Sequence, residues 1–409
     1  MFSEKGTLFL VIFIVFQFSM FAVRTFRISN NKPRTSKTMS NSHDKLYQIA
    51  LTLIPKIGDV LVRQLISYCG SAEQAFKTPI PKLLKVPNIG QIIAQNMQEK
   101  SVLENAWKII QEADKQEVEL LFYTDVNYPN RLKQLYDSPV LLYYKGKADL
   151  NVNKTVAIVG TRQSTEYGKQ TTEHIIKELS VYNPLIVSGL AYGIDIVAHK
   201  SCLINKVPTV GVMASGIDLI YPYQHKNTSI QMQELGGILT EQTFGTQPDP
   251  RFFPQRNRII AGMADVTIVV EAAVKGGALI TAEYANNYHK DVFAVPGQIG
   301  KSFSEGCNKL IKENKAQIFT SIKDVIEALS WDMESNENAK NQPAKLDFSN
   351  FTEEESAVMS LLYKNDEMHI DDLAWKAQIH VAKLSSLLLN LEFQGYIKSL
   401  VGKKYRIGT

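Results

Sequence analysis

The stretch VAIVGTR at residues 156–162 decides the class of fold. Its first four residues are apolar and mostly β-branched, which predicts a buried strand, and Gly160 then turns the chain. A glycine lets the backbone approach a ligand closely, and the Thr161 hydroxyl and Arg162 guanidinium are groups that bind a phosphate. Such a strand and turn are typical of the ligand-binding edge of an open α/β sheet.

Short apolar runs recur after this stretch, with amphipathic helical stretches between most of them. The predicted strands are residues 156–159, 185–187, 209–213, 237–239, 266–270, 292–295 and 316–319. This alternation implies a mostly parallel sheet covered by helices on both faces, with the loops that follow the strands along one edge. We therefore predict a Rossmann-like, doubly wound α/β core over residues 120–330.

The loop SGLAYGID at residues 188–195 also has the chemistry of a phosphate site. It follows a predicted strand, turns at Gly189, and leads into a helix that is expected to begin near Gly193. Free backbone N–H groups at such a helix start form an anion nest. Asp195 then lies in the first helical turn, where we expect it to cap the helix rather than to act in catalysis.

Two more loops add charge and aromatic rings. EAAVKGGAL at residues 271–279 places a glycine pair before a helix, with Lys275 beside it, although a glycine pair alone also fits a plain tight turn. FFPQRNR at residues 252–258 combines two aromatic and two basic residues, which suits the stacked bases and phosphates of a single strand. Because Arg256 and Arg258 cannot share one helix face, we expect one to face the ligand and the other to pair inside the fold.

Together these four loops form the predicted site. Its candidate contacts are Gly160, Thr161, Arg162, Ser188, Gly189, Gly193, Phe253, Arg256, Asn257, Arg258, Lys275, Gly276 and Gly277. We predict no catalytic residue, metal ligand or small-molecule cofactor. The first strand is not followed by a Gly-x-Gly-x-x-Gly fingerprint, no complete Walker-type sequence is present, and His, Cys and Asp residues lack metal-ligand spacing.

Residues 41–118 are predicted to form a helical domain of the helix-hairpin-helix or SAM-like kind. LIPKIG at residues 53–58 recurs as KVPNIG at residues 85–90, and each precedes a helix. Glycine turns of this type can offer backbone N–H groups to a phosphate. The alternative is a pair of turns inside a small helical bundle that touch no DNA.

Residues 331–347 are rich in Asn, Glu, Lys and Ser and are predicted to be a linker. Residues 348–409 are predicted to form a winged-helix domain. Its expected helices and hairpin are residues 353–363, 370–377, 381–394 and 396–407. The last helix is rich in leucine and has Lys383 as its only basic residue, so we expect a folding or protein-contact role rather than readout of duplex DNA.

Residues 1–40 form an apolar and basic leader, with an apolar run at residues 8–23. We favour a translation start at Met39; the alternatives are a membrane anchor and, least favoured, a cleaved secretory signal. The leader has a net charge of +5, which leaves −1 on the rest of a chain of net charge +4. Nucleic-acid binding must therefore come from a local patch. Three widely spaced cysteines fit a reducing cytoplasm.

These motifs resemble the signature of the DprA/Smf (DNA processing protein A) family. The matching stretches are IVGTR at 158–162, SGLA at 188–191, GID at 193–195, FP at 253–254, RNRIIAG at 256–262, LITA at 279–282, AVPG at 294–297 and GCN at 306–308. The resemblance implies a core that binds single-stranded DNA, protects incoming DNA, forms a homodimer and helps to load the RecA recombinase during natural transformation. The contacts that it implies are Arg162, Ser188, Gly189, Phe253, Arg256 and Asn257.

One departure from the family pattern falls within the predicted site. The family usually has Ser-Gly-Ser before the LITA motif, whereas this chain has Gly276, Gly277 and Ala278. Two hydroxyl groups are lost there, while backbone N–H donation is retained.

Two other classes of function share parts of this pattern. The glycine-pair loop is similar to that of nucleotide phosphoribohydrolases, but the proline and third glycine of their loop are missing. The winged helix would suit a regulatory protein that binds duplex DNA. We expect a binding protein rather than an enzyme.

Binding to DNA is predicted to weaken as salt concentration rises, because phosphate contacts release counterions from the strand. Titrations of a labelled oligonucleotide at increasing sodium chloride concentration measure this directly. An affinity that stays constant from low to high salt would contradict a binding mode led by phosphates.

Overall fold

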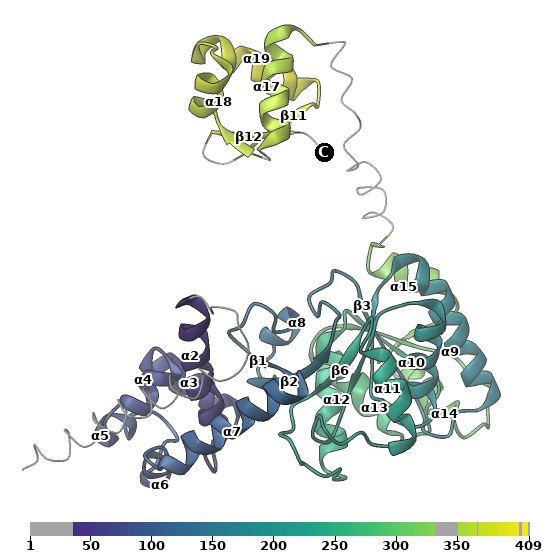
Figure 1. Ribbon diagram of the computed structural model, residues 1–409. Helices are drawn as coiled ribbons and strands as arrows, with labels where there is room; N and C mark the ends of the chain where they lie inside the picture. The colour runs from purple at the N-terminus through teal and green to yellow at the C-terminus, as the bar shows by residue number, and fades with distance from the viewer. Residues whose placement is uncertain (1–35, 332–350, 366, 401–402, 408–409) are drawn as a thin grey trace, which may run out of the picture. The chain divides into compact units, whose positions relative to one another are not determined.

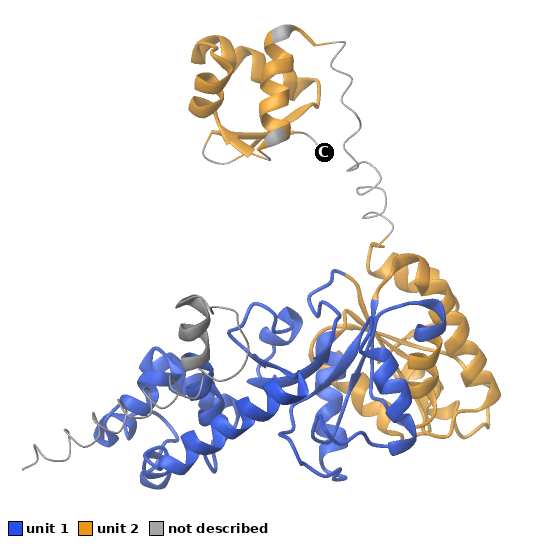
Figure 2. Cartoon of the chain, viewed as in Figure 1, with its two compact units in different colours: residues 1–153, 185–191, 202–263 blue, residues 154–184, 192–201, 264–409 orange. Residues whose placement is uncertain are grey.

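The computed structural model describes residues 36–331, 351–365, 367–400 and 403–407. Backbone contacts divide the chain into two compact units (Figure 2). The units comprise residues 1–153, 185–191 and 202–263, and residues 154–184, 192–201 and 264–409. Residues 120–330, the predicted core, are thus shared between both units. The apolar run at 8–23 and most of the predicted linker at 331–347 lie outside the described residues.

The first unit begins with the predicted helical domain (Figure 1). Its helices are α2 (Ser36–Thr52), α3 (Asp59–Cys69), α4 (Ala72–Lys77), α5 (Ile80–Leu83), α6 (Gln91–Asn96) and α7 (Lys100–Gln116). The two repeated turns have the same backbone geometry. Lys56 and Asn88 adopt positive φ angles of 68° and 64°, and Gly58 and Gly90 then precede α3 and α6 in extended conformations. The sequence repeat is therefore a structural repeat.

The first unit also contains five strands in the order β1-β2-β6-β5-β4. They are β1 (Glu119–Phe122), β2 (Leu141–Gly146), β6 (Gly237–Thr240), β5 (Thr209–Val212) and β4 (Leu185–Ser188). The β6-β5-β4 part is parallel, whereas β1 and β2 extend it with antiparallel pairings. The connecting helices include α8 (Asn130–Lys133), α11 (Lys226–Met232) and α12 (Phe252–Met263).

The second unit contains four parallel strands in the order β3-β7-β8-β9. They are β3 (Thr155–Val159), β7 (Val266–Val269), β8 (Asp291–Ala294) and β9 (Gln317–Ile318). Every residue of β3 and β7 is buried, as expected for parallel strands covered on both faces. The helices are α9 (Glu166–Leu179), α13 (Gly277–Asn287), α14 (Glu305–Lys312) and α15 (Ile322–Ala328), and α10 (Ile194–Asn205) begins in this unit. The predicted, mostly parallel α/β architecture is confirmed.

The C-terminal residues form a winged-helix fold of their own. Its elements are α17 (Glu353–Lys364), β10 (Glu367–His369), α18 (Ile370–Ala377), α19 (Val381–Phe393), β11 (Ile397–Leu400) and β12 (Lys404–Ile407). Leu384, Leu388 and Leu391 of α19 are fully buried in the core of this fold. These three leucines therefore serve folding, whereas Leu389 of the same helix is 53% exposed. Among the described helices, none is both long enough and apolar enough to span a bilayer.

Candidate nucleic-acid interface

The loop that follows β3 is held tightly in the second unit. The N–H of Thr161 donates to the Glu271 carbonyl at 2.7 Å, and the N–H of Ile194 donates to the Thr161 carbonyl at 3.2 Å. Gly193 has a φ of 79°, and a Cβ atom there would lie 2.1 Å from the Thr161 carbonyl oxygen. Only glycine fits at this position, so the turn before α10 packs directly on the loop. Arg162 itself is exposed.

The predicted loop at residues 271–279 lies between β7 and α13 of the same unit. Gly276 is the N-cap of α13, and its N–H donates to the Ala273 carbonyl at 2.8 Å. Lys275 and Gly277 are exposed at the start of the helix, whereas Ala278 is buried. Lys275 thus places an exposed positive charge beside the start of α13, which suits an anion. The alanine that replaces a usual family serine lies in the protein interior.

Arg256 makes its hydrogen bonds inside the first unit. It is 5% exposed, and its Nη1 donates to the carbonyl groups of Gly189 and Val212, which follow β4 and end β5. Its Nε donates to the Asn257 side chain at 3.3 Å. Ser188 is likewise fully buried. Arg256 therefore holds two strand ends and α12 together within the first unit.

Arg258 pairs with acidic side chains elsewhere in the first unit. Its Nη2 donates to the Glu241 carboxylate and lies 3.7 Å from an oxygen of Asp59. Burial raises the pKa of both carboxyl groups, and the guanidinium opposes that rise. Because Asp59 begins α3, this contact attaches the helical domain to α12. Both arginines pair with groups of the fold, and contact of either one with a ligand stays a prediction.

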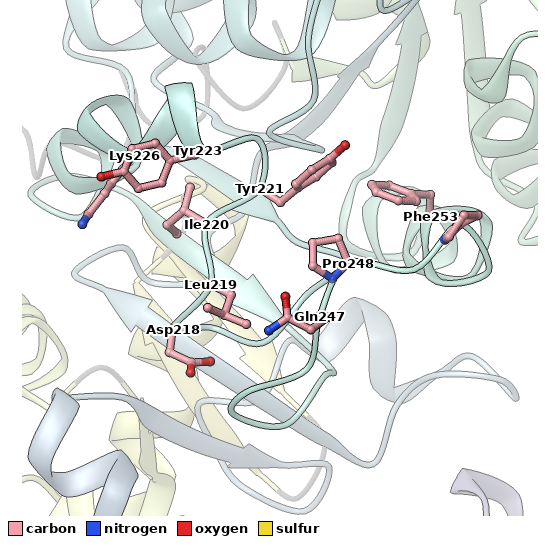
Figure 3. Close-up of a pocket in the computed structure, with 10 residues that line it drawn as sticks. Asp218, Leu219, Ile220, Tyr221, Tyr223, Lys226, Gln247, Pro248 and Phe253 are labelled. Carbon is pink, nitrogen blue, oxygen red and sulfur yellow. The ribbon is translucent and has the colours of Figure 1, made fainter.

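An aromatic hollow of about 550 Å³ lies beside the other end of the predicted motif (Figure 3). Phe253 lines it together with Tyr221, and their ring centroids are 5.9 Å apart. Tyr221 and Tyr223 are 48% and 72% exposed, and the Nζ of Lys226 lies 5.5 Å from the Tyr223 ring. Of these four residues, only Phe253 is among the contacts predicted from the sequence. The signal for the other three is the pair of tyrosines and the lysine in YPYQHK at residues 221–226.

Two titratable groups near these loops, Asp195 and Cys307, have structural surroundings. Asp195 lies in the first turn of α10, as predicted. Burial raises the pKa of the Cys307 thiol to about 12, so the reactive thiolate is scarce at neutral pH. Across the described ranges, no cluster of three or more His, Cys, Asp or Glu side chains could hold a metal ion.

The structure thus sorts the predicted contacts into separate groups. In the second unit, the Gly160–Arg162 loop packs against Gly193 and against Glu271, the first residue of the predicted loop at residues 271–279. In the first unit, Gly189, Arg256 and Asn257 are joined by hydrogen bonds. Phe253 belongs to the aromatic hollow, and Arg258 to the contact with the helical domain.

Comparison with known proteins places this arrangement in a family. Residues 119–330 match the model of DNA recombination-mediator protein A, and residues 338–403 match the DprA winged helix domain. Protein Smf of Synechocystis sp. is 35% identical over 295 residues, which is 71% of this chain and 74% of that protein. DNA processing protein DprA of Streptococcus pneumoniae is 44% identical over 200 residues, covering 49% and 70% of the two chains.

A solved structure supports the same assignment. The X-ray structure of DNA processing protein A (DprA) from Streptococcus pneumoniae aligns with a TM-score of 0.56 and 33% sequence identity. The alignment covers 69% of this chain and 96% of that one. The chain therefore belongs to the DprA/Smf family, whose members are described as DNA recombination-mediator and DNA processing proteins.

The packing of the turn before α10 gives a direct test of the loop geometry. We expect Gly193→Ala to lower the free energy of unfolding by about 2–4 kcal/mol, because the φ angle is unfavourable and the new methyl group meets backbone. Gly277→Ala is the matched control, since a Cβ atom there meets nothing within 4 Å. Urea denaturation of both variants measures the difference. Equal stability would refute the close contact at Gly193.

Proposed function

We propose that this protein binds single-stranded DNA without turnover and acts in DNA processing during recombination or natural transformation. Phosphates would be bound by the exposed side chains of Arg162 and Lys275 in the second unit. Bases would stack in the aromatic hollow of the first unit. Such contacts carry little sequence information, so binding is expected to be largely independent of base sequence.

The aromatic hollow is the observation that carries this proposal. Tyr221 and Tyr223 are too exposed to be explained by the hydrophobic core, and Phe253 lies beside them. Lys226 provides a cation for the phosphate that accompanies each base. The bases of a duplex are stacked inside it and cannot reach rings in a hollow, whereas the bases of a single strand can. Aromatic rings with interleaved cations are the usual platform for unpaired strands.

The family assignment supports two further parts of the proposal. We propose that the protein works as a homodimer and that it helps to load the RecA recombinase on DNA that it protects. We propose that the dimer forms and loads RecA in the cytoplasm, where the recombinase and the incoming strand meet. Co-sedimentation of the protein with RecA, with and without single-stranded DNA, tests the partnership separately from DNA binding.

The winged helix is less suited to be the main DNA-binding element. The leucines of α19 are largely committed to the core of that fold, and Lys383, its only basic residue, pairs with Glu354. A helix that reads a major groove needs free polar side chains on its exposed face. A regulatory protein for duplex DNA is therefore the weaker candidate. If the protein were instead a nucleotide phosphoribohydrolase, it would release the base from a nucleoside monophosphate.

Fluorescence anisotropy with labelled oligothymidylate and a duplex of equal length tests the proposal. We expect tighter binding of the single strand, and weaker binding by about 5- to 150-fold in Phe253→Ala, since stacking contributes about 1–3 kcal/mol per base. Arg162→Ala should weaken binding. It should also reduce the salt slope, the steepness with which log K falls with log salt concentration, by about 0.7, which corresponds to the loss of one phosphate contact.

Two exposed residues provide matched controls for these variants. Tyr136 is a 76% exposed aromatic residue outside the hollow, and Arg406 is an exposed arginine of the winged helix. Tyr136→Ala and Arg406→Ala should bind as the unmodified protein does. Equal affinity for duplex and single strand, unaffected by Phe253→Ala and Arg162→Ala, would move the function to the terminal domains.

A further inference from the structure

A buried carboxylate lies directly behind the loop that is proposed to bind phosphate. Glu271 comes two residues after β7 and is only 3% exposed. A buried charge is costly unless its oxygens are hydrogen-bonded. A carboxylate also repels a nearby phosphate. The position of Glu271 behind this loop therefore needs a structural explanation.

The hydrogen bonds of Glu271 give that reason, because they hold both ends of one short loop. At the first end, its backbone carbonyl accepts from the N–H of Thr161 at 2.7 Å. At the second end, its Oε2 accepts from the N–H of Thr165 at 2.9 Å, and its Oε1 accepts from the Thr165 hydroxyl at 2.5 Å. Between these anchors stands Arg162, which is exposed.

The Thr165 hydroxyl is oriented by a second contact. Its oxygen accepts from the N–H of Gly168 at 3.2 Å, which caps the start of α9. The hydroxyl proton is therefore free to point at Glu271. Space for the carboxylate comes from Gly168, where a Cβ atom would lie 2.1 Å from Oε2. The loop, the helix cap and the glycine thus all fit the carboxylate.

We propose that Glu271 is a positioning residue, which sets Arg162 for contact with a DNA phosphate without touching the strand itself. The inference rests on the proposed function and assigns a role to a residue behind the site. Both carboxylate oxygens are occupied by Thr165, so their charge is directed to the loop rather than to the ligand. Without the bonds to Thr165 the loop would lose one of its two anchors on Glu271, and the backbone that carries Arg162 would be held less firmly.

A role in stability alone makes a different prediction. If Glu271 only stabilised the second unit, its loss would lower stability but would leave the contribution of Arg162 to binding unchanged. If it positions Arg162, the two residues act as one unit and their effects on binding are not additive. A double-mutant cycle therefore separates the two roles.

The experiment measures oligothymidylate binding by the full chain at several salt concentrations. We expect Glu271→Ala to weaken binding about as much as Arg162→Ala, roughly tenfold, and to reduce the salt slope equally. The double variant should bind no worse than either single one. Glu271→Gln should bind within about twofold of the unmodified protein, because its amide retains an acceptor for the Thr165 N–H.

Two further variants guard against a trivial loss of folding. Gly168→Ala pushes on the same carboxylate from α9 and should weaken binding in the same way, although it removes no side chain. Asp265→Ala is the matched control. Asp265 accepts from the N–H of Thr155 at 2.9 Å and so anchors the opposite end of β3, far along the strand from Arg162. It should lower stability and leave binding unchanged.

The outcomes separate this inference from the proposed function. If the unmodified protein does not bind oligothymidylate, the proposed function fails. If it binds, and Arg162→Ala weakens binding while Glu271→Ala does not, the positioning role alone is wrong. Additive effects in the double variant, with Glu271→Gln as weak as Glu271→Ala, would also overturn it.

Discussion

Parallel strands end with backbone groups that have no further strand partner, and the site of this protein depends on how those groups are satisfied. In the first unit, Arg256 donates to the carbonyl group of Gly189, which follows β4, and to that of Val212, the last residue of β5. In the second unit, Glu271 accepts from both ends of the loop that follows β3. A buried cation and a buried anion thus provide hydrogen bonds to backbone groups that longer strands would otherwise pair with one another.

This arrangement separates the residues that shape the site from those that can reach a ligand. Arg256 and Glu271 are buried, and their polar groups are directed to the backbone and to Thr165. Arg162 and Lys275 are exposed on loops that these contacts hold or adjoin. Rigid presentation reduces the ordering that binding would otherwise require, so exposed cations on held loops bind more strongly than the same cations on mobile ones.

Most of the architecture could be predicted because the relevant signals are local and periodic. The buried strands β3 and β7 appear as continuous apolar runs, and α18 begins and ends where its pattern does. The short strands β1 and β10 were missed. β1 follows a long helix without a turn signal, and β10 has three residues, too few for an alternating pattern to be recognised.

The candidate site was predictable only in part, for a physical reason. Sequence gives the residue type but not the direction of a long side chain. Arg256 and Arg258 therefore looked like ligands for phosphate although both reach inward to groups that are distant in the chain. From the sequence, Glu271 is only the first residue of a glycine loop. Its contact with Thr165 could not be predicted, because Thr165 lies more than 100 residues earlier. Tyr221 stands in an irregular segment with no periodic pattern.

We infer that DNA binds to the loops and the hollow of residues 120–330 rather than to the terminal domains. Hydrogen–deuterium exchange of the full chain, with and without oligothymidylate, tests this inference at the level of backbone amides. We expect slower exchange on binding within residues 160–165, 218–226, 247–253 and 271–279, and unchanged exchange within residues 353–407. Protection confined to the repeated turns at residues 53–58 and 85–90, or to the winged helix, would contradict it.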